Sequence, residues 1–223
     1  MSGIPYWLDS ELYRYQDSLH HRVREAYRAA YNVLESAYRA ENEKLEQDLT
    51  ASTDDEDREL NSQIINYEND RWREQREALA AMALALLATL NKSFLDAEKG
   101  WNLNKSHPPD PKGYGGKRQS QLVKQVIEYK SRFGVDLETL DGFETVREVE
   151  LARHCCLHNE GEPTADYFTL TKTRLLNGRF NISLTPEQLD SFIDELSRFG
   201  DRLSAGMTEN RKKASTVNKK DQA

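Results

Sequence analysis

Two long stretches in the first half of the chain repeat apolar residues every three to four positions, which is the spacing of an amphipathic helix. The first stretch covers residues 9–49, with Asp9 placed to cap it, and the second covers about 57–102. A polar segment at 51–55 separates the two and can turn the chain. The simplest arrangement of two such helices is an antiparallel hairpin, which we predict for residues 1–104.

The centre of the second stretch, residues 78–88, is rich in alanine and apolar nearly all round. A helix without a polar face is buried on several sides. We therefore expect this segment to pack against the C-terminal part of the chain or against a second subunit.

The second half of the chain predicts shorter elements. Residues 105–117 contain three prolines and three glycines, which predicts a loop. A third helix follows at about 118–133 and ends at Gly134. A fourth begins near Asp141, which is placed to cap it with Glu144 as its capping-box partner.

A strand-like pattern follows the fourth helix. Residues 167–171 and 180–184 flank the pair Asn177-Gly178, which is typical of a β-hairpin around a two-residue turn. A short helix that ends at this Asn-Gly pair is the alternative interpretation.

The last helix has a clear start signal, because Thr185-Pro186-Glu187-Gln188 supplies a cap, a proline at the first helical position and a capping-box glutamine. Residues 207–223 are polar and basic, and we expect this tail to be disordered. The patterns together predict a mostly all-α chain. It has a long hairpin, a helical bundle over 118–206 and a small β-hairpin or irregular insertion before the last helix.

Composition narrows the class of protein. The chain has 223 residues, of which 37% are hydrophobic and 31% charged, and its net charge is −7, which is typical of a soluble protein that can bury a core. No apolar leader follows Met1, and the longest apolar run, Ala78 to Leu90, is too short to cross a bilayer unaided. Cys155 and Cys156 are adjacent, so we expect buried fillers and no disulfide framework. These features favour a cytoplasmic protein without a membrane partner.

A segment that holds both cysteines and two histidines lies where the fourth helix ends, with Gly161 as its stop signal. Glu150, His154 and His158 are successive i, i+4 neighbours and share one face of the helix. Arg153 and His158 are five residues apart and roughly 140° out of line. If these two act together, they need either a frayed helix end or a second copy of the helix. A two-fold dimer supplies that second copy.

An arginine, a polar residue and then a histidine near the end of a late helix resembles the signature of HEPN domains, helical bundles whose catalytic members are metal-independent ribonucleases. Arg153 matches the motif arginine, His154 the polar position after it and His158 the motif histidine. Residues 159–161, Asn-Glu-Gly, resemble the polar turn that often follows. The resemblance extends over about residues 118–203.

This resemblance implies an RNA substrate, a homodimer, and no metal or cofactor. The ribose 2′-hydroxyl would attack the adjacent phosphate and leave a cyclic phosphate. His158 would act as general base or acid, Arg153 would hold the scissile phosphate, and His154 would orient or share the proton transfer. Glu150 and Asn159 would support them. The motif often occurs in toxin–antitoxin and antiviral defence systems, where an antitoxin or a sensor restrains the enzyme.

Charge is distributed unevenly along the chain. Residues 41–70 carry eleven acidic and two basic side chains, whereas residues 105–133 carry seven basic and two acidic ones. The basic segment precedes the motif helix and could attract phosphate through Lys117, Arg118 and Lys124. An ordinary solvated helix face explains the same pattern equally well.

Two other functions fit the sequence. One is a non-catalytic HEPN-like interaction module whose hairpin drives assembly. The other is a metal site on Glu150, His154 and His158, with Glu162 or Asp166 as a further ligand.

Overall fold

The computed structural model describes residues 6–52, 54–103, 120–177 and 181–220. Over these ranges the chain is mostly helical and contains no strand, which confirms the all-α prediction. The loop predicted at 105–117 lies outside the described residues, and so do Lys117 and Arg118.

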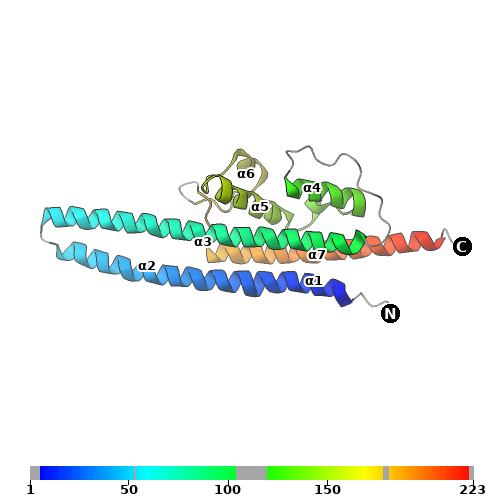
Figure 1. Cartoon of the computed structure of the whole chain (residues 1–223), viewed down its shortest axis with the longest axis horizontal. Coiled ribbons are helices and arrows are strands. Elements are labelled where there is room, and N and C mark those ends of the chain that lie inside the picture. The colour runs from blue at the N-terminus through cyan, green and yellow to red at the C-terminus, as the bar shows by residue number, and fades with distance from the viewer. Residues whose placement is uncertain (1–5, 53, 104–119, 178–180, 221–223) are drawn as a thin grey trace.

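The first half of the chain forms a long antiparallel hairpin, as the apolar spacing predicts (Figure 1). The helix α1 (Tyr6–Asp17), the π-helical segment η1 (Ser18–Arg24) and α2 (Glu25–Ala51) follow one another without a gap, and α3 (Asp55–Leu103) returns beside them. Neither glycine nor proline occurs from Tyr6 to Lys99, so no helix breaker interrupts these segments.

Aromatic contacts hold the two long helices together toward the tip of the hairpin. Tyr38 of α2 packs edge-on against Trp72 of α3, with ring centroids 5.3 Å apart. The Tyr38 hydroxyl also donates to the Oδ1 atom of Asn69 at 2.7 Å. The outer part of the hairpin therefore has specific contacts of its own, although it projects beyond the other helices (Figure 1).

The last helix, α7 (Pro186–Lys220), lies along the base of the hairpin (Figure 1). Its predicted capping box is confirmed, because the Thr185 backbone N–H donates to Gln188 Oε1 and the Gln188 backbone N–H donates to Thr185 Oγ1. A Cβ atom at Gly200 would lie 3.1 Å from the side chains of Leu12 and Tyr15, so glycine lets α7 approach the first helix closely. The buried residues of α7 include Leu189, Phe192, Ile193, Leu196, Phe199 and Leu203.

The remaining helices lie on one side of α3 (Figure 1). They are α4 (Gln121–Glu128), η2 (Tyr129–Phe133), η3 (Leu137–Thr139), α5 (Phe143–His158) and α6 (Ala165–Leu170). Gly134 ends η2 in the left-handed conformation, as predicted. The motif helix α5 packs directly on α3, and one continuous apolar core joins the hairpin, α5 and α7.

The start of α5 differs from the prediction. Gly142, and not Asp141, is the N-cap residue, and its φ of +86° suits glycine. A Cβ atom at this position would lie 2.2 Å from the Glu195 carbonyl oxygen of α7, which only glycine avoids. Asp141 instead pairs with Arg198 at 3.2 Å.

The predicted β-hairpin is wrong, and the segment before α7 is irregular. Residues 165–170 form the helix α6, because the Thr164 hydroxyl caps it by accepting from the Tyr167 backbone N–H. Leu176 and Ile182 form one isolated antiparallel bridge, which does not extend into strands in the described part of this segment.

The prediction of a disordered tail from residue 207 is also wrong, because α7 continues to Lys220. Met207 is buried, and the Asn210 side chain donates to the Phe133 carbonyl oxygen at 2.8 Å. These contacts extend the packed part of α7, and the helix-favouring residues beyond Gly206 continue it.

The contact between His20 and α7 predicts a pH-dependent stability. His20 Nε2 lies 2.9 Å from Ser197 Oγ. Burial, together with the charge of Arg24 and neighbouring His21, lowers the His20 pKa against the opposing effect of Asp194. His20 therefore binds a proton more readily in the unfolded chain than in the folded protein. The neutral His20 stabilises the fold at a pH above its pKa in the unfolded chain, and this stabilisation is lost as the pH falls through the lower pKa of the folded protein.

We expect the free energy of unfolding in urea to decrease between about pH 7.5 and 5.5, more steeply for the wild type than for His20→Gln. Because His21 contributes to the lowered His20 pKa, His21→Gln should flatten the slope only in part, and less than His20→Gln does. Equal slopes for the wild type and His20→Gln would contradict this assignment.

Candidate functional site

His154 and His158 lie on the outer face of α5, opposite its buried face, whereas Arg153 lies at the edge of the buried face, toward α3. Phe143, Val146, Val149, Ala152 and Cys155 are buried and fix the helix against the core. His154 and His158 are exposed, and about a third of the Arg153 side chain is accessible. The sequence pattern therefore presents the polar motif to solvent from a rigid element.

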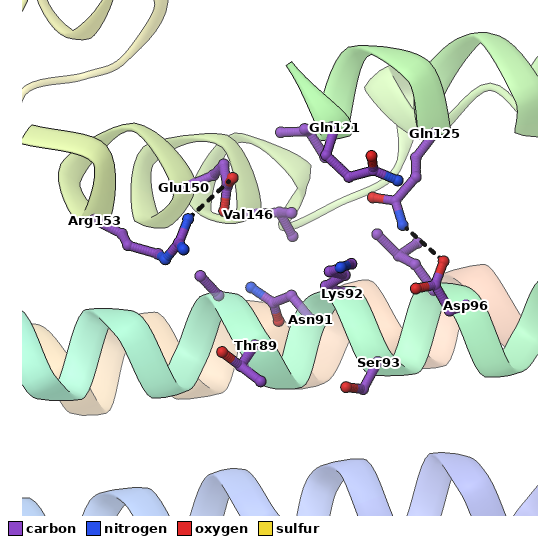
Figure 2. A pocket seen from close by; sticks show the side chains of 13 residues that line it. Thr89, Asn91, Lys92, Ser93, Asp96, Gln121, Gln125, Val146, Glu150 and Arg153 are labelled. Carbon is purple, nitrogen blue, oxygen red and sulfur yellow. Dashed lines mark hydrogen bonds and ion pairs between the residues drawn. The ribbon is translucent and has the colours of Figure 1, made fainter. Parts of the chain in front are cut away.

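Arg153 projects over the gap between α5 and α3 (Figure 2). Its Nη1 atom lies 3.6 Å from Glu150 Oε1, one turn earlier on the same helix. This distance makes an ion pair and is longer than a hydrogen bond. The guanidinium therefore keeps donors for another partner.

His154 and His158 form a pair at the end of α5, with ring centroids 4.9 Å apart. The helix remains regular through His158, and Asn159 closes it as the C-cap residue. The Asn159 side chain donates to the Glu162 carbonyl oxygen, and Gly161, at φ +83°, donates its backbone N–H to Cys155. The helix thus ends one residue earlier than predicted, because Glu160, at φ +52°, takes the position after the C-cap that was expected for Gly161.

The regular end of α5 decides how Arg153 and His158 are related. Because α5 does not fray before His158, the two residues keep the roughly 140° separation of a helix and point to different sides. His154 lies on the side of His158, and Glu150 lies between the two sides, within ion-pair distance of Arg153. One chain alone therefore does not bring the motif arginine and histidine together.

Exposed apolar residues occur on α3 and at the end of α5. Met82 of α3 is 69% exposed, and Leu86, one turn further along α3, is 43% exposed. Leu157 of α5, one turn after Arg153, is 50% exposed. The chain therefore covers the apolar segment at 78–88 only in part. Ala80, Ala83 and Leu84 are buried, whereas Met82 and Leu86 are exposed.

A buried ionic network, which the sequence analysis did not find, holds α5 to α7. Glu148 is 1% exposed and accepts hydrogen bonds from the Tyr167 hydroxyl and from the backbone N–H and Nε of Arg174. Arg174 also donates to both carboxylate oxygens of Glu195 at 2.9 Å, and to Thr145 Oγ1 at 2.8 Å. These residues position α5, and so indirectly the motif that it carries.

This network perturbs the proton affinities of its members. Burial, with the Glu148 carboxylate beside it, raises the pKa of the Tyr167 hydroxyl. Burial favours the neutral form of Glu195, but the hydrogen bonds from Thr145 and Arg174 outweigh that effect and lower the Glu195 pKa. The only signal in the sequence was Glu148 itself, an acidic residue on the otherwise apolar side of a helix.

The two cysteines fit the expected role of fillers. Cys155 is buried, with its Sγ atom 3.9 Å from Thr164 Oγ1. Burial, together with Cys155 and Glu77, raises the pKa of the Cys156 thiol to about 11, which disfavours the reactive thiolate.

The metal alternative lacks a ligand set. Across the described ranges, no group of three or more His, Cys, Asp or Glu side chains is placed to hold a metal ion. Glu150, His154 and His158 lie on one face, but a helical stripe needs convergent donors from elsewhere. Lys124, the one predicted RNA-binding residue that the structure describes, is half-buried on α4.

Comparison with known proteins gives no match, whether against protein-family models, curated proteins or solved structures. Among the residues that the structure describes, one helix, Asp55–Lys99, is long and apolar enough by composition to cross a membrane, with a mean hydropathy of 1.6 over its most apolar window. The chain buries 44% of that window itself, and core helices of soluble proteins meet the same criterion.

Proposed function

We propose that this protein is a metal-independent endoribonuclease of HEPN type, which acts as a homodimer with a composite site between two copies of α5. The observation that carries the proposal is the position of Arg153 and His158, both accessible on one rigid helix but pointing to different sides. An isologous interface would set Arg153 of each chain beside His158 of the partner subunit.

The chemistry follows from these two side chains. A histidine accepts and releases protons near neutral pH, so His158 is the general base that takes the proton of the ribose 2′-hydroxyl. The 2′-oxygen then bonds to the adjacent phosphorus, and the bond from phosphorus to the 5′-oxygen breaks. Arg153 stabilises the charge on the phosphate, and the histidine site returns a proton to the leaving 5′-oxygen. The products are a 2′,3′-cyclic phosphate and a 5′-hydroxyl.

The neighbouring residues have secondary roles. His154 contacts the His158 ring and would orient it or share the proton. Glu150 would orient Arg153 through their ion pair, and Asn159 would hold the turn after His158. Lys117, Arg118 and Lys124 would add phosphate contacts along the RNA.

The exposed apolar residues of α3 and α5 support the dimer. We expect Met82→Glu to weaken self-association at least about tenfold, because an unpaired charge in an interface is costly. Light scattering at micromolar concentration measures the change, and RNA cleavage should fall with the dimer population.

Val33→Glu on α2 is the matched control, because Val33 is 69% exposed, as Met82 is, but lies on the outer hairpin. It should leave both readouts unchanged. If the Met82→Glu protein stays dimeric, Met82 is not in the dimer interface. If it is a monomer with full activity, the proposal of a composite site between two chains is wrong.

Incubation of the purified protein with total RNA in excess EDTA tests the proposed reaction. We expect cleavage with cyclic phosphate ends, detected by end-labelling before and after phosphatase treatment. Cleavage that requires added metal, or products with 5′-phosphates, would contradict the mechanism.

A non-catalytic interaction module is the second candidate. Leu60, Ile64 and Tyr67 of α3 are exposed at helical spacing on the outer hairpin, a pattern typical of a contact face. In a toxin–antitoxin or antiviral setting, this face would bind the antitoxin or sensor. Assembly that is unaffected by Arg153→Ala, without RNA cleavage by the wild type, would favour this candidate.

A further inference from the structure

A cavity of about 490 Å³ lies between α3, α4 and α5, next to Arg153. Its volume is in the range that small-molecule ligands occupy in proteins. Arg153 and Glu150 border it from α5, Asn91 and Asp96 from α3, and Gln121 and Gln125 from α4 (Figure 2). Hydrogen-bonding side chains therefore converge on it from three helices.

The Asn91 side chain is the strongest sign that the cavity takes a ligand. Asn91 is 3% exposed and projects from α3 into the space between α3 and α5 (Figure 2). Its Oδ1 atom accepts from the Tyr15 hydroxyl, but its Nδ2 atom has no partner within the described residues. A buried amide N–H without an acceptor is costly, so a ligand that supplies the acceptor would bind favourably here.

Glu150 offers a hydrogen-bond acceptor to the same cavity from α5. A carboxylate only accepts hydrogen bonds, and Glu150 lies 3.6 Å from Arg153, too far for a hydrogen bond to it. The cavity therefore offers a donor at Asn91 and an acceptor at Glu150. A matching ligand presents a carbonyl oxygen next to N–H groups.

Guanine fits this pattern best among the four RNA bases. Its Watson–Crick edge sets the O6 acceptor beside the N1–H and N2–H donors, and two adjacent N–H groups suit a carboxylate. Adenine and cytosine each offer one amino group beside a ring-nitrogen acceptor, so they would pair only one of the two Glu150 carboxylate oxygens, and the N–H of uracil lies between two carbonyls that a carboxylate would repel.

We infer that this cavity is a base-specific subsite that binds guanine, with Asn91 Nδ2 donating to O6 and Glu150 accepting from the N–H edge. The inference rests on the proposed ribonuclease function for its place in the reaction. The guanine would belong to a nucleotide beside the phosphate that Arg153 holds. Single-stranded RNA is read through such splayed bases.

Binding of GMP, AMP, CMP and UMP, measured by isothermal titration calorimetry, tests the subsite without any need for cleavage. We expect GMP to bind at least about tenfold more tightly than the other three. Asn91→Asp keeps an oxygen for Tyr15 and removes the donor, so GMP affinity should fall about tenfold. Glu150→Gln, at a partly exposed position, should abolish the preference for GMP.

Asn69→Asp is the matched control, because Asn69 also lies on α3 and accepts from a tyrosine hydroxyl, yet lies outside the cavity. It should leave GMP binding unchanged. Equal binding of the four nucleotides, no binding of GMP, or unchanged GMP affinity in folded Asn91→Asp and Glu150→Gln proteins would overturn the inference.

The cleavage assay separates the two proposals. RNA cut without preference for guanine, together with equal binding of the four nucleotides, would overturn the subsite and leave the ribonuclease standing. Selective GMP binding by a protein that cuts no RNA would support the guanine site and contradict the ribonuclease.

Discussion

Replacement of either Arg153 or His158 by alanine should lower the rate of RNA cleavage by about 10²–10⁴-fold, which is the range for loss of a general acid–base or of a charge-stabilising group. His158 is exposed and about a third of the Arg153 side chain is accessible, so the fold should persist. The rate is measured on a labelled RNA in excess EDTA. Circular dichroism and thermal unfolding verify that each variant is folded.

Two exposed residues of the same types supply the controls. His21 lies on η1 near Glu25, and Arg198 on α7 pairs with Asp141. Their alanine variants should cleave RNA at the wild-type rate. Equal cleavage by Arg153→Ala, His158→Ala and the wild type would locate the activity elsewhere or in a contaminant.

The second large effect is on stability. Arg174→Met should lower the free energy of unfolding by about 3–5 kcal/mol, because it leaves the carboxylate of Glu148 buried without its cation. Glu148 is 1% exposed and takes its charge-assisted hydrogen bonds from Arg174. Urea unfolding followed by circular dichroism measures the loss.

Arg198→Ala is the matched control for this prediction, since Arg198 also pairs with a carboxylate but both partners are more than half exposed. It should cost less than about 1 kcal/mol. A similar, small loss in both variants would mean that the network contributes little to stability.

The same network predicts sensitivity to acid. The pKa of Glu195 is lowered in the folded protein, so its contribution is present above the unfolded pKa and is lost as the pH falls through the folded value. The stability difference between the wild type and Arg174→Met should therefore shrink as the pH falls below about 4. If the stability difference between the wild type and Arg174→Met does not change with pH, the ionisation of Glu195 does not contribute to it.

The parts of the fold that local patterns determine were predictable. The hairpin follows from apolar spacing, and the start of α7 follows from Thr185 and Gln188, which bond each other over one helical turn. The outward position of the motif also follows from its spacing on α5. In each case, the residues that decide the structure are close in the sequence.

The errors arose where distant contacts override local preference. Asp141 is a good cap by type, but the close approach of α7 at Glu195 requires glycine at 142. The tail continues as a helix partly because Asn210 bonds to Phe133, 77 residues earlier. Contacts between residues so far apart in the sequence cannot be predicted from the residues that surround each of them.

The site shows the same division. Arg153, His154 and His158 were predicted as site residues because they form a short motif, whereas Asn91 and Arg174 were not predicted. Asn91 matters because its amide is buried beside a cavity formed by three helices, and Arg174 matters because Glu148 and Glu195 meet it from α5 and α7. Only the packed structure places these groups together.

A mixing experiment tests the composite dimer site most directly. The Arg153→Ala and His158→Ala proteins, each silent alone, are combined in equal amounts under conditions that exchange subunits. Half of the dimers are then mixed, and each mixed dimer holds one intact site out of two, so the mixture should recover about a quarter of the wild-type cleavage rate. A mixture that stays silent although mixed dimers form and the wild type is active would contradict a site shared between two copies of α5.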